Sequence, residues 1–146
     1  MFYQNLICVL KASSKQHTNL ITNESLTDYK FFCFNGYVDS VMVCLDRSSG
    51  DTKYYFFDKD WKFKRINVRG KNAPADFTLS KPSCIDKMFD IASFLSKDLP
   101  FARVDLYQCD NQIYFGELTF YPTSGFDPNL LLQTDEYFGK LINIGK

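Results

Sequence analysis

The segment FARVDLYQCDNQIYFGELTFYPTSGF, residues 101–126, decides how the chain is expected to fold. Two runs rich in β-branched, aliphatic and aromatic residues flank a Cys-Asp-Asn sequence, a pattern typical of a β-hairpin. Four polar residues lie in the middles of these runs: Arg103, Asp105, Glu117 and Thr119. Because charged residues are depleted in strands, this group is a candidate functional site.

The length of the turn decides which of these side chains share a face. If Asn111 closes a three-residue loop in the left-handed conformation, Arg103 faces Glu117 and Asp105 lies diagonal to Glu117. A two-residue turn would instead place Asp105 and Glu117 on opposite faces. In the three-residue alternative the other face is apolar and is expected to pack on a helix or a second sheet. That face comprises Ala102, Val104, Leu106, Tyr114, Leu118 and Phe120.

Two carboxylates roughly 5–8 Å apart on neighbouring strands suit Mg²⁺, which takes a few hard oxygen ligands and keeps water or phosphate for the rest. Arg103 beside them suits a phosphate, because its planar guanidinium donates in a fork and stays charged. The Pro-Thr-Ser-Gly sequence at 122–125 predicts a tight turn that can present backbone N–H groups to an anion. The alternative is an exposed Arg103–Glu117 pair with Asp105 in solvent.

The composition indicates one β-rich domain, since the 146 residues are 17% aromatic and carry a formal net charge of +0. This neutral balance does not indicate nucleic acid or an anionic membrane as a partner. No apolar run approaches the ~20 residues of a membrane-spanning helix. Without the pattern of a secretory signal at the start, we expect a cytoplasmic protein. The five scattered cysteines and the single His17 indicate neither a zinc site, a disulfide framework nor a histidine-dependent catalyst.

Further elements are predicted on both sides of this hairpin. Residues 2–11 are a candidate strand, and residues 27–45 form a second hairpin around Asn35-Gly36, which favours a type I′ turn. In its two-residue register Lys30 shares a face with Phe32, Phe34, Tyr37, Asp39, Val41 and Val43. The Lys30 cation then either reaches solvent at the sheet edge or waits for an anionic ligand.

Residues 52–57 and 61–68 are expected to be strands, and residues 83–99 a helix opened by a capping box at Ser83 to Asp86. The helix carries an apolar stripe that should pack across the sheet: Ile85, Met88, Phe89, Ala92 and Leu95. Asp127-Pro128 is expected to open a short helical segment. Residues 59–71 are basic and fit either a nucleic-acid surface or a solvated edge strand, and the acidic neighbours favour the edge strand.

Four segments together resemble the C-terminal half of the ATP-grasp family, in its TupA-like branch linked to teichuronopeptide and cell-surface polysaccharide biosynthesis. They are DYKFFCFNG at 28–36, IDKMFDIASFLSKDLPF at 85–101, RVDLY at 103–107 and IYFGELTFYPTSGF at 113–126. The resemblance implies an α+β fold in which an antiparallel sheet of hairpins carries a packed helix. It also implies an enzyme that joins a carboxylate to an amine through an acylphosphate, using ATP and Mg²⁺.

The resemblance implies a role for each matching residue. Asp105 and Glu117 correspond to the metal-binding acids, and Thr119 stands where many members have a metal-binding asparagine. Arg103 corresponds to the catalytic arginine near the transferred phosphoryl group and also contacts the nucleotide. Three further residues have looser counterparts, namely Lys30 near the nucleotide phosphates and Ser124 and Gly125 in the loop near the acceptor substrate.

The same resemblance predicts residues 1–27 to be a remnant of the hinge region and residues 28–146 to be the C-terminal lobe. We therefore expect a truncated ligase that is inactive without a complementing N-terminal lobe or a homo-oligomer. Its partners would be a nucleotide and a small carboxylate or a sugar-polymer precursor. One alternative is a non-catalytic module that binds carbohydrate or protein through exposed aromatics at 54–61. Another is a metal-dependent nuclease, which is disfavoured because Thr119 stands where its lysine should be.

Overall fold

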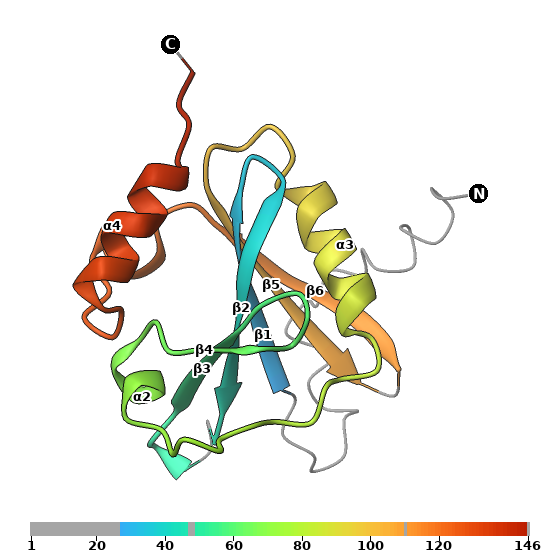
Figure 1. Ribbon diagram of the computed structural model, residues 1–146. Coiled ribbons are helices and arrows are strands. Elements are labelled where there is room, and N and C mark those ends of the chain that lie inside the picture. Colours follow the sequence, from blue (N-terminus) through green and yellow to red (C-terminus); the bar gives the residue numbers. More distant parts are fainter. Residues whose placement is uncertain (1–26, 47–48, 110, 146) are drawn as a thin grey trace.

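The computed structural model describes residues 27–46, 49–109 and 111–145, which form one antiparallel sheet with helices on both faces (Figure 1). The strand order is β4-β3-β2-β1-β5-β6. The strands are β1 Thr27–Phe34, β2 Tyr37–Leu45, β3 Lys53–Phe57, β4 Phe63–Lys64, β5 Ala102–Cys109 and β6 Gln112–Thr119. The helices are α2 Val68–Lys71, α3 Ile85–Leu95, the 3₁₀ turn η2 Pro122–Gly125 and α4 Leu132–Leu141. The α+β expectation is confirmed.

Helix α3 covers one face of the sheet and forms the larger core. Ile85, Met88, Phe89 and Ala92 of the predicted stripe are buried against β1, β2 and β5. The predicted capping box is wrong, because Cys84 is the N-cap and makes no side-chain cap hydrogen bond. The Ser83 hydroxyl instead donates to Asn111 Oδ1 at 2.9 Å.

The β1–β2 hairpin has the predicted type I′ turn, since Asn35 and Gly36 both have positive φ, 50° and 83°. Its register is not regular, however, because Phe32 pairs with Ser40 while Cys33 pairs with Val38. Asp39 is the extra residue of this bulge. Lys30 therefore pairs with Met42 instead of sharing a face with Val41 and Val43, as the regular register predicts.

The β5–β6 hairpin has a two-residue turn, because Cys109 pairs with Gln112. Of the two turn lengths considered, the two-residue alternative is therefore present, although Asn111 does have the left-handed conformation, with a φ of 59°. A bulge between the pairs Leu106–Phe115 and Asp105–Glu117 leaves Gly116 unpaired and reverses the parity beyond it. Asp105 and Glu117 thus lie directly opposite each other.

The same bulge changes which residues of β6 face α3. Ile113, Phe115 and Leu118 belong to the α3 core, together with Val104 and Leu106 of β5. Tyr114 lies between Ile113 and Phe115, so its side chain is on the other face of the sheet, and Phe120 is 48% exposed. Neither takes the predicted place in that core.

Helix α4 covers part of the other face and forms a second core. Phe138 packs with a set of buried residues from β1, β2 and β3: Phe32, Phe34, Met42, Cys44 and Phe56. The Thr134 hydroxyl donates to the Ile66 carbonyl at 2.7 Å and fixes the start of the helix. The helical segment predicted from Asp127-Pro128 begins later, at Leu132. The strand predicted at 61–68 shortens to Phe63–Lys64, because α2 begins at Val68.

The strand expected at 2–11 lies outside the described residues, and so does most of the segment 1–27. The division of the chain at residue 27 therefore stays a prediction. Within the described part, no helix is both long and apolar enough to span a bilayer.

Candidate functional site

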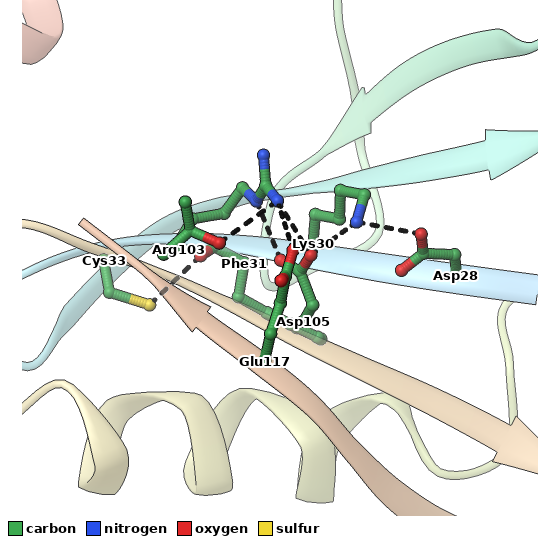
Figure 2. A network of polar contacts seen from close by, with 8 residues as sticks. Asp28, Lys30, Phe31, Cys33, Arg103, Asp105 and Glu117 are labelled. Atoms are coloured by element: carbon green, nitrogen blue, oxygen red, sulfur yellow. Dashed lines mark hydrogen bonds and ion pairs between the residues drawn. The ribbon is translucent and has the colours of Figure 1, made fainter. Parts of the chain in front are cut away.

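Strands β1, β5 and β6 bring five charged residues together on the sheet face opposite α3. Lys30 pairs with Asp105, and Asp105 pairs with Glu117, so these residues are adjacent in one row across three strands. Figure 2 shows Lys30, Arg103, Asp105 and Glu117 pointing toward one another, with Asp28 on the far side of the Lys30 amine. We call Asp28, Lys30, Arg103, Asp105 and Glu117 the charged cluster.

Asp105 is the centre of the charged cluster. Arg103 donates from Nε to Asp105 Oδ1 at 2.8 Å and from its terminal nitrogen to Oδ2 at 2.9 Å, which is a bidentate contact. Lys30 Nζ binds Asp105 Oδ2 and also lies 2.9 Å from Asp28 Oδ2. Both oxygens of Asp105 therefore face cations.

Arg103 also links Asp105 to strand β6. The same terminal nitrogen lies 3.1 Å from Glu117 Oε1 and 3.3 Å from the Thr119 hydroxyl. Arg103 is paired with Thr119 in the sheet register, so its side chain reaches sideways to Glu117. The structure thus brings Arg103, Asp105, Glu117 and Thr119 together, through a register that differs from both of those considered from the sequence.

Burial distinguishes the members of the cluster. The Asp105 and Asp28 side chains are buried, Lys30 and Arg103 are 12% and 13% exposed, and Glu117 is 62% exposed. The alternative of a fully exposed ion pair with a solvated Asp105 is therefore wrong. Glu117 is the acid through which the buried cluster meets solvent.

Burial is the largest single influence on the pKa of Lys30 and acts to lower it. Hydrogen bonds and charge attraction to Asp105 and Asp28 outweigh burial, so the pKa of Lys30 is raised above its ordinary 10.5. The pKa of Arg103 is raised in the same way, with burial opposed by Asp105, Glu117 and Asp28. Both side chains therefore remain cationic at neutral pH.

Asp28 is the cluster member that the sequence analysis did not single out as a site residue. It lies two positions before Lys30 on β1, and alternate residues of a strand share a face. This alternation could have predicted that Asp28 shares a face with Lys30. Two alternatives were considered for Lys30, an amine that reaches solvent at the sheet edge and a cation that waits for an anionic ligand. In the structure the Lys30 amine is instead paired with Asp28 and Asp105.

The donor set is suitable for Mg²⁺ in chemistry, although not as a closed cage. Asp105 and Glu117 are paired in the sheet, and the Thr119 hydroxyl contacts the same guanidinium as both acids. Among the described residues no group of three or more potential acidic, cysteine or histidine ligands lies together around a metal position. Two carboxylates would leave most positions of a hard cation to water or phosphate.

The predicted turn at residues 122–125 is present as η2, and Phe120 and Tyr121 connect it to the end of β6. Thr123, Ser124 and Gly125 are three consecutive residues with positive φ, 52°, 55° and 83°. Ser124 and Gly125 are exposed, and neither residue contacts the charged cluster through a hydrogen bond that the structure shows. Ser124 and Gly125 therefore lie in the 3₁₀ turn that comes after Thr119, the last residue of β6.

A half-open cavity of about 590 Å³ lies beside the charged cluster, between β1, residues 120–127 and α4. Phe32 on its wall pairs with Arg103, and Phe120 follows Thr119, so the cavity adjoins the Arg103 end of the cluster. The cavity could not be predicted from the sequence, because its walls come from segments that are distant in sequence.

Two other predicted surfaces are used inside the fold. Tyr55, Phe56 and Phe57 are buried, and Trp61 stacks on Phe57 at 4.5 Å, so the aromatics at 54–61 do not form the exposed surface that the binding-module alternative needs. In the basic segment, Lys64 pairs with buried Asp39 at 2.6 Å and Arg65 donates to the carbonyls of residues 70, 73 and 74.

The six-stranded sheet with its helices is compatible with an ATP-grasp-like lobe. A comparison with protein families identifies the family, because the sequence model of the family described as TupA-like ATPgrasp matches residues 4–143. The chain therefore belongs to the TupA-like ATP-grasp family, as its motifs predict. Neither the curated proteins nor the solved structures gave a match.

Proposed function

We propose that the charged cluster is the phosphate- and metal-binding face of an ATP-dependent ligase that joins a carboxylate to an amine. The observation that carries the proposal is the bidentate Arg103–Asp105 contact, which lies one strand from Lys30 and one strand from Glu117. Family membership supports a nucleotide as the partner. Phosphoryl transfer needs chiefly fixed cations and a clamped metal. This face supplies the two cations, and its carboxylates are the groups that would hold the metal.

Arg103 is the proposed catalytic residue, and it also contacts the nucleotide. Its fork matches the oxygens of a phosphoryl group, and its five donors allow it to keep one acid while it binds the anion. Lys30 is the second cation, held at the centre of the sheet by Asp28 and Asp105 for the nucleotide phosphates. Because both remain charged at neutral pH, neither needs to gain a proton before the anion binds.

Asp105 and Glu117, with the Thr119 hydroxyl, are the proposed ligands of Mg²⁺. When bound, the ion would neutralise charge on the nucleotide phosphates. Asp105 is engaged by both cations, so its release depends on Lys30 and Arg103 turning toward phosphate. Glu117 is 62% exposed and contacts one of these cations, Arg103, through Oε1.

The remaining expectations belong to the same proposal. Ser124 and Gly125 would lie near the acceptor, which we propose to be a small carboxylate or a precursor of a cell-surface polysaccharide, handled in the cytoplasm. Groups that hold adenine are expected from an N-terminal lobe, with residues 1–27 as the hinge toward it. A homo-oligomer is the other way in which the site could be completed.

The experiment that tests the proposal is Mn²⁺ water-proton relaxation, with and without a non-hydrolysable ATP analogue. Wild type is expected to bind Mn²⁺ weakly and to bind it more tightly with the nucleotide. Loss of a ligand in Glu117→Gln should weaken Mn²⁺ binding by at least about tenfold.

The matched control is Glu136→Gln, which alters an exposed glutamate of α4 that lies outside the charged cluster. It should bind Mn²⁺ like wild type. Equal Mn²⁺ binding by Glu117→Gln and wild type would remove Glu117 from the ligand set and with it the proposed metal face.

A further inference from the structure

The cavity beside the charged cluster has an aromatic floor. Phe32, Phe34, Phe101 and Phe138 contact one another with ring centroids 5.3–6.3 Å apart, and all four line the cavity. Its volume of about 590 Å³ is within the range of small-molecule sites, roughly 300–1,000 Å³. The rings provide a rigid apolar surface with electron-rich faces.

Two large aromatic side chains on one wall of the cavity are exposed to solvent. Phe120 is 48% exposed and Tyr121 is 82% exposed, and both lie on the segment that connects β6 to η2. Two such residues in sequence at the rim of a cavity mark a surface that a ligand can cover, since contiguous exposed apolar patches are typical of binding sites.

The charged residues that line the cavity are both acids, Asp127 and Asp135, which enter it from two different segments. Asp127 is fixed by its own loop, because its Oδ1 accepts a hydrogen bond from the Asn129 N–H at 2.9 Å. Asp135 lies in the first turn of α4 and is exposed. Aromatic faces and carboxylates both attract cations, so the two features of the cavity select the same kind of ligand.

We infer that this cavity binds a small organic amine, with its apolar or aromatic body against the phenylalanine floor and its ammonium group between Asp127 and Asp135. The inference deepens the proposed function, because an amine is the group that a carboxylate–amine ligase must hold beside its phosphate face. Binding itself requires neither nucleotide nor metal, so the cavity can be tested apart from the ligase proposal.

The experiment is an NMR titration of the full chain, without nucleotide or metal. It uses three probes that share a phenyl ring, have side chains of similar length and differ in the charge of the terminal group. The probes are 2-phenylethylamine, neutral 2-phenylethanol and anionic 3-phenylpropanoate. We expect the amine to bind with a dissociation constant of about 1 mM, as suits a ligand of this size. The alcohol should bind at least about threefold more weakly and the anion more weakly still. Shifts should be concentrated at α4 and residues 120–127.

Variants assign the charge selectivity to the named acids. The double variant Asp127→Asn/Asp135→Asn should weaken the amine about fivefold and leave the alcohol unchanged. Glu136→Gln removes one charge from the same helix outside the cavity lining and should leave amine binding unchanged. Tyr121→Ala, at an exposed position where folding is not at risk, should weaken the amine by about threefold.

The inference is overturned if the alcohol binds as tightly as the amine, if the double asparagine variant binds the amine like wild type, or if no probe saturates. Nucleotide-dependent Mn²⁺ binding with no amine binding would leave the ligase proposal standing and remove the cavity. The reverse pattern would keep the cavity and remove the metal face.

Discussion

Gly116 is the residue on which the alignment of the charged cluster depends. A Cβ atom at this position would lie 2.6 Å from Tyr107 Cε2 and 3.1 Å from the Asp105 carbonyl oxygen. Gly116→Ala should therefore lower the free energy of unfolding by about 1–3 kcal/mol, because the bulge or Tyr107 must move. Urea denaturation measures this change.

Gly139→Ala is the matched control for this variant. Nothing lies within 4 Å of a Cβ atom at Gly139, which is in α4, and alanine favours helix. It should raise the free energy of unfolding by about 0.5–1 kcal/mol. Equal effects of the two substitutions would show that the close approach at Gly116 does not matter.

Lys30 makes a second prediction at the scale of single residues. Lys30→Met leaves the buried Asp105 and Asp28 with less positive charge and should lower the free energy of unfolding by about 3 kcal/mol near pH 7. The pKa of Lys30 is raised on folding, so its contribution is complete below its ordinary pKa of 10.5 and is lost as pH rises through the folded value.

The measurement is denaturant unfolding between pH 8 and 11. The difference between wild type and Lys30→Met should be constant at the lower end of this range and should shrink at the upper end. Lys53→Met serves as the control, because Lys53 pairs with the half-exposed Asp46 at the sheet surface. A pH-independent difference for Lys30→Met would contradict the assigned charge interaction.

At the scale of elements, the attachment of α4 rests on a polar contact as well as on its apolar face. The Tyr137 hydroxyl donates to Asp39 Oδ1 at 2.9 Å, and Lys64 binds the other oxygen of this buried acid. Burial and the Asp39 contact raise the pKa of Tyr137 to about 12, so the hydroxyl remains a donor at neutral pH. The bulge in β2 thus supplies an acid that ties α4 to the sheet.

Tyr137→Phe should lower the free energy of unfolding by about 1 kcal/mol, because it removes one hydrogen bond to a charged acceptor and keeps the ring. Amide hydrogen exchange should show faster opening of α4 than in wild type. Tyr121→Phe, which alters a hydroxyl on an 82% exposed side chain, should change neither quantity. If the two variants behave alike, the Asp39 contact does not anchor the helix.

The elements could be predicted largely from sequence, and their registers could not. Apolar alternation and the Asn35-Gly36 turn are local signals, and they located β1, β2, β5 and β6 correctly. Each hairpin contains a bulge, at Asp39 and Gly116, and a bulge depends on contacts between strands that no single segment encodes. Neither turn length considered gives the observed pairing of Asp105 with Glu117. The three-residue loop makes them diagonal and the two-residue turn places them on opposite faces, and only the bulge at Gly116 brings them opposite each other.

At the scale of the whole molecule, the sheet joins two cores that face opposite helices. Cys33 is buried on the α3 face and Cys44 on the α4 face. Because β1 and β2 contribute to both cores, we expect the described domain to unfold as one unit. The charged cluster and the cavity then share a single scaffold.

Pulsed thiol labelling in increasing urea, followed by peptide mass spectrometry, measures this cooperativity. Cys33 and Cys44 should become reactive with the same urea midpoint. Cys84 and Cys109, which are only half-buried, should react at lower urea and provide the reference for local exposure. Labelling of Cys44 well before Cys33 would show that the α4 face opens separately.

The two edge strands of the described sheet, β4 and β6, differ in how readily another chain could pair with them. Strand β4 is only two residues long, whereas β6 has eight residues and is the outermost strand at its end of the described sheet. A long outer strand is a template on which chains can add and aggregate. The bulge at Gly116 interrupts the regular spacing of donors and acceptors along that strand. The glycine that brings Asp105 opposite Glu117 should therefore also make β6 a poor template for fibril growth.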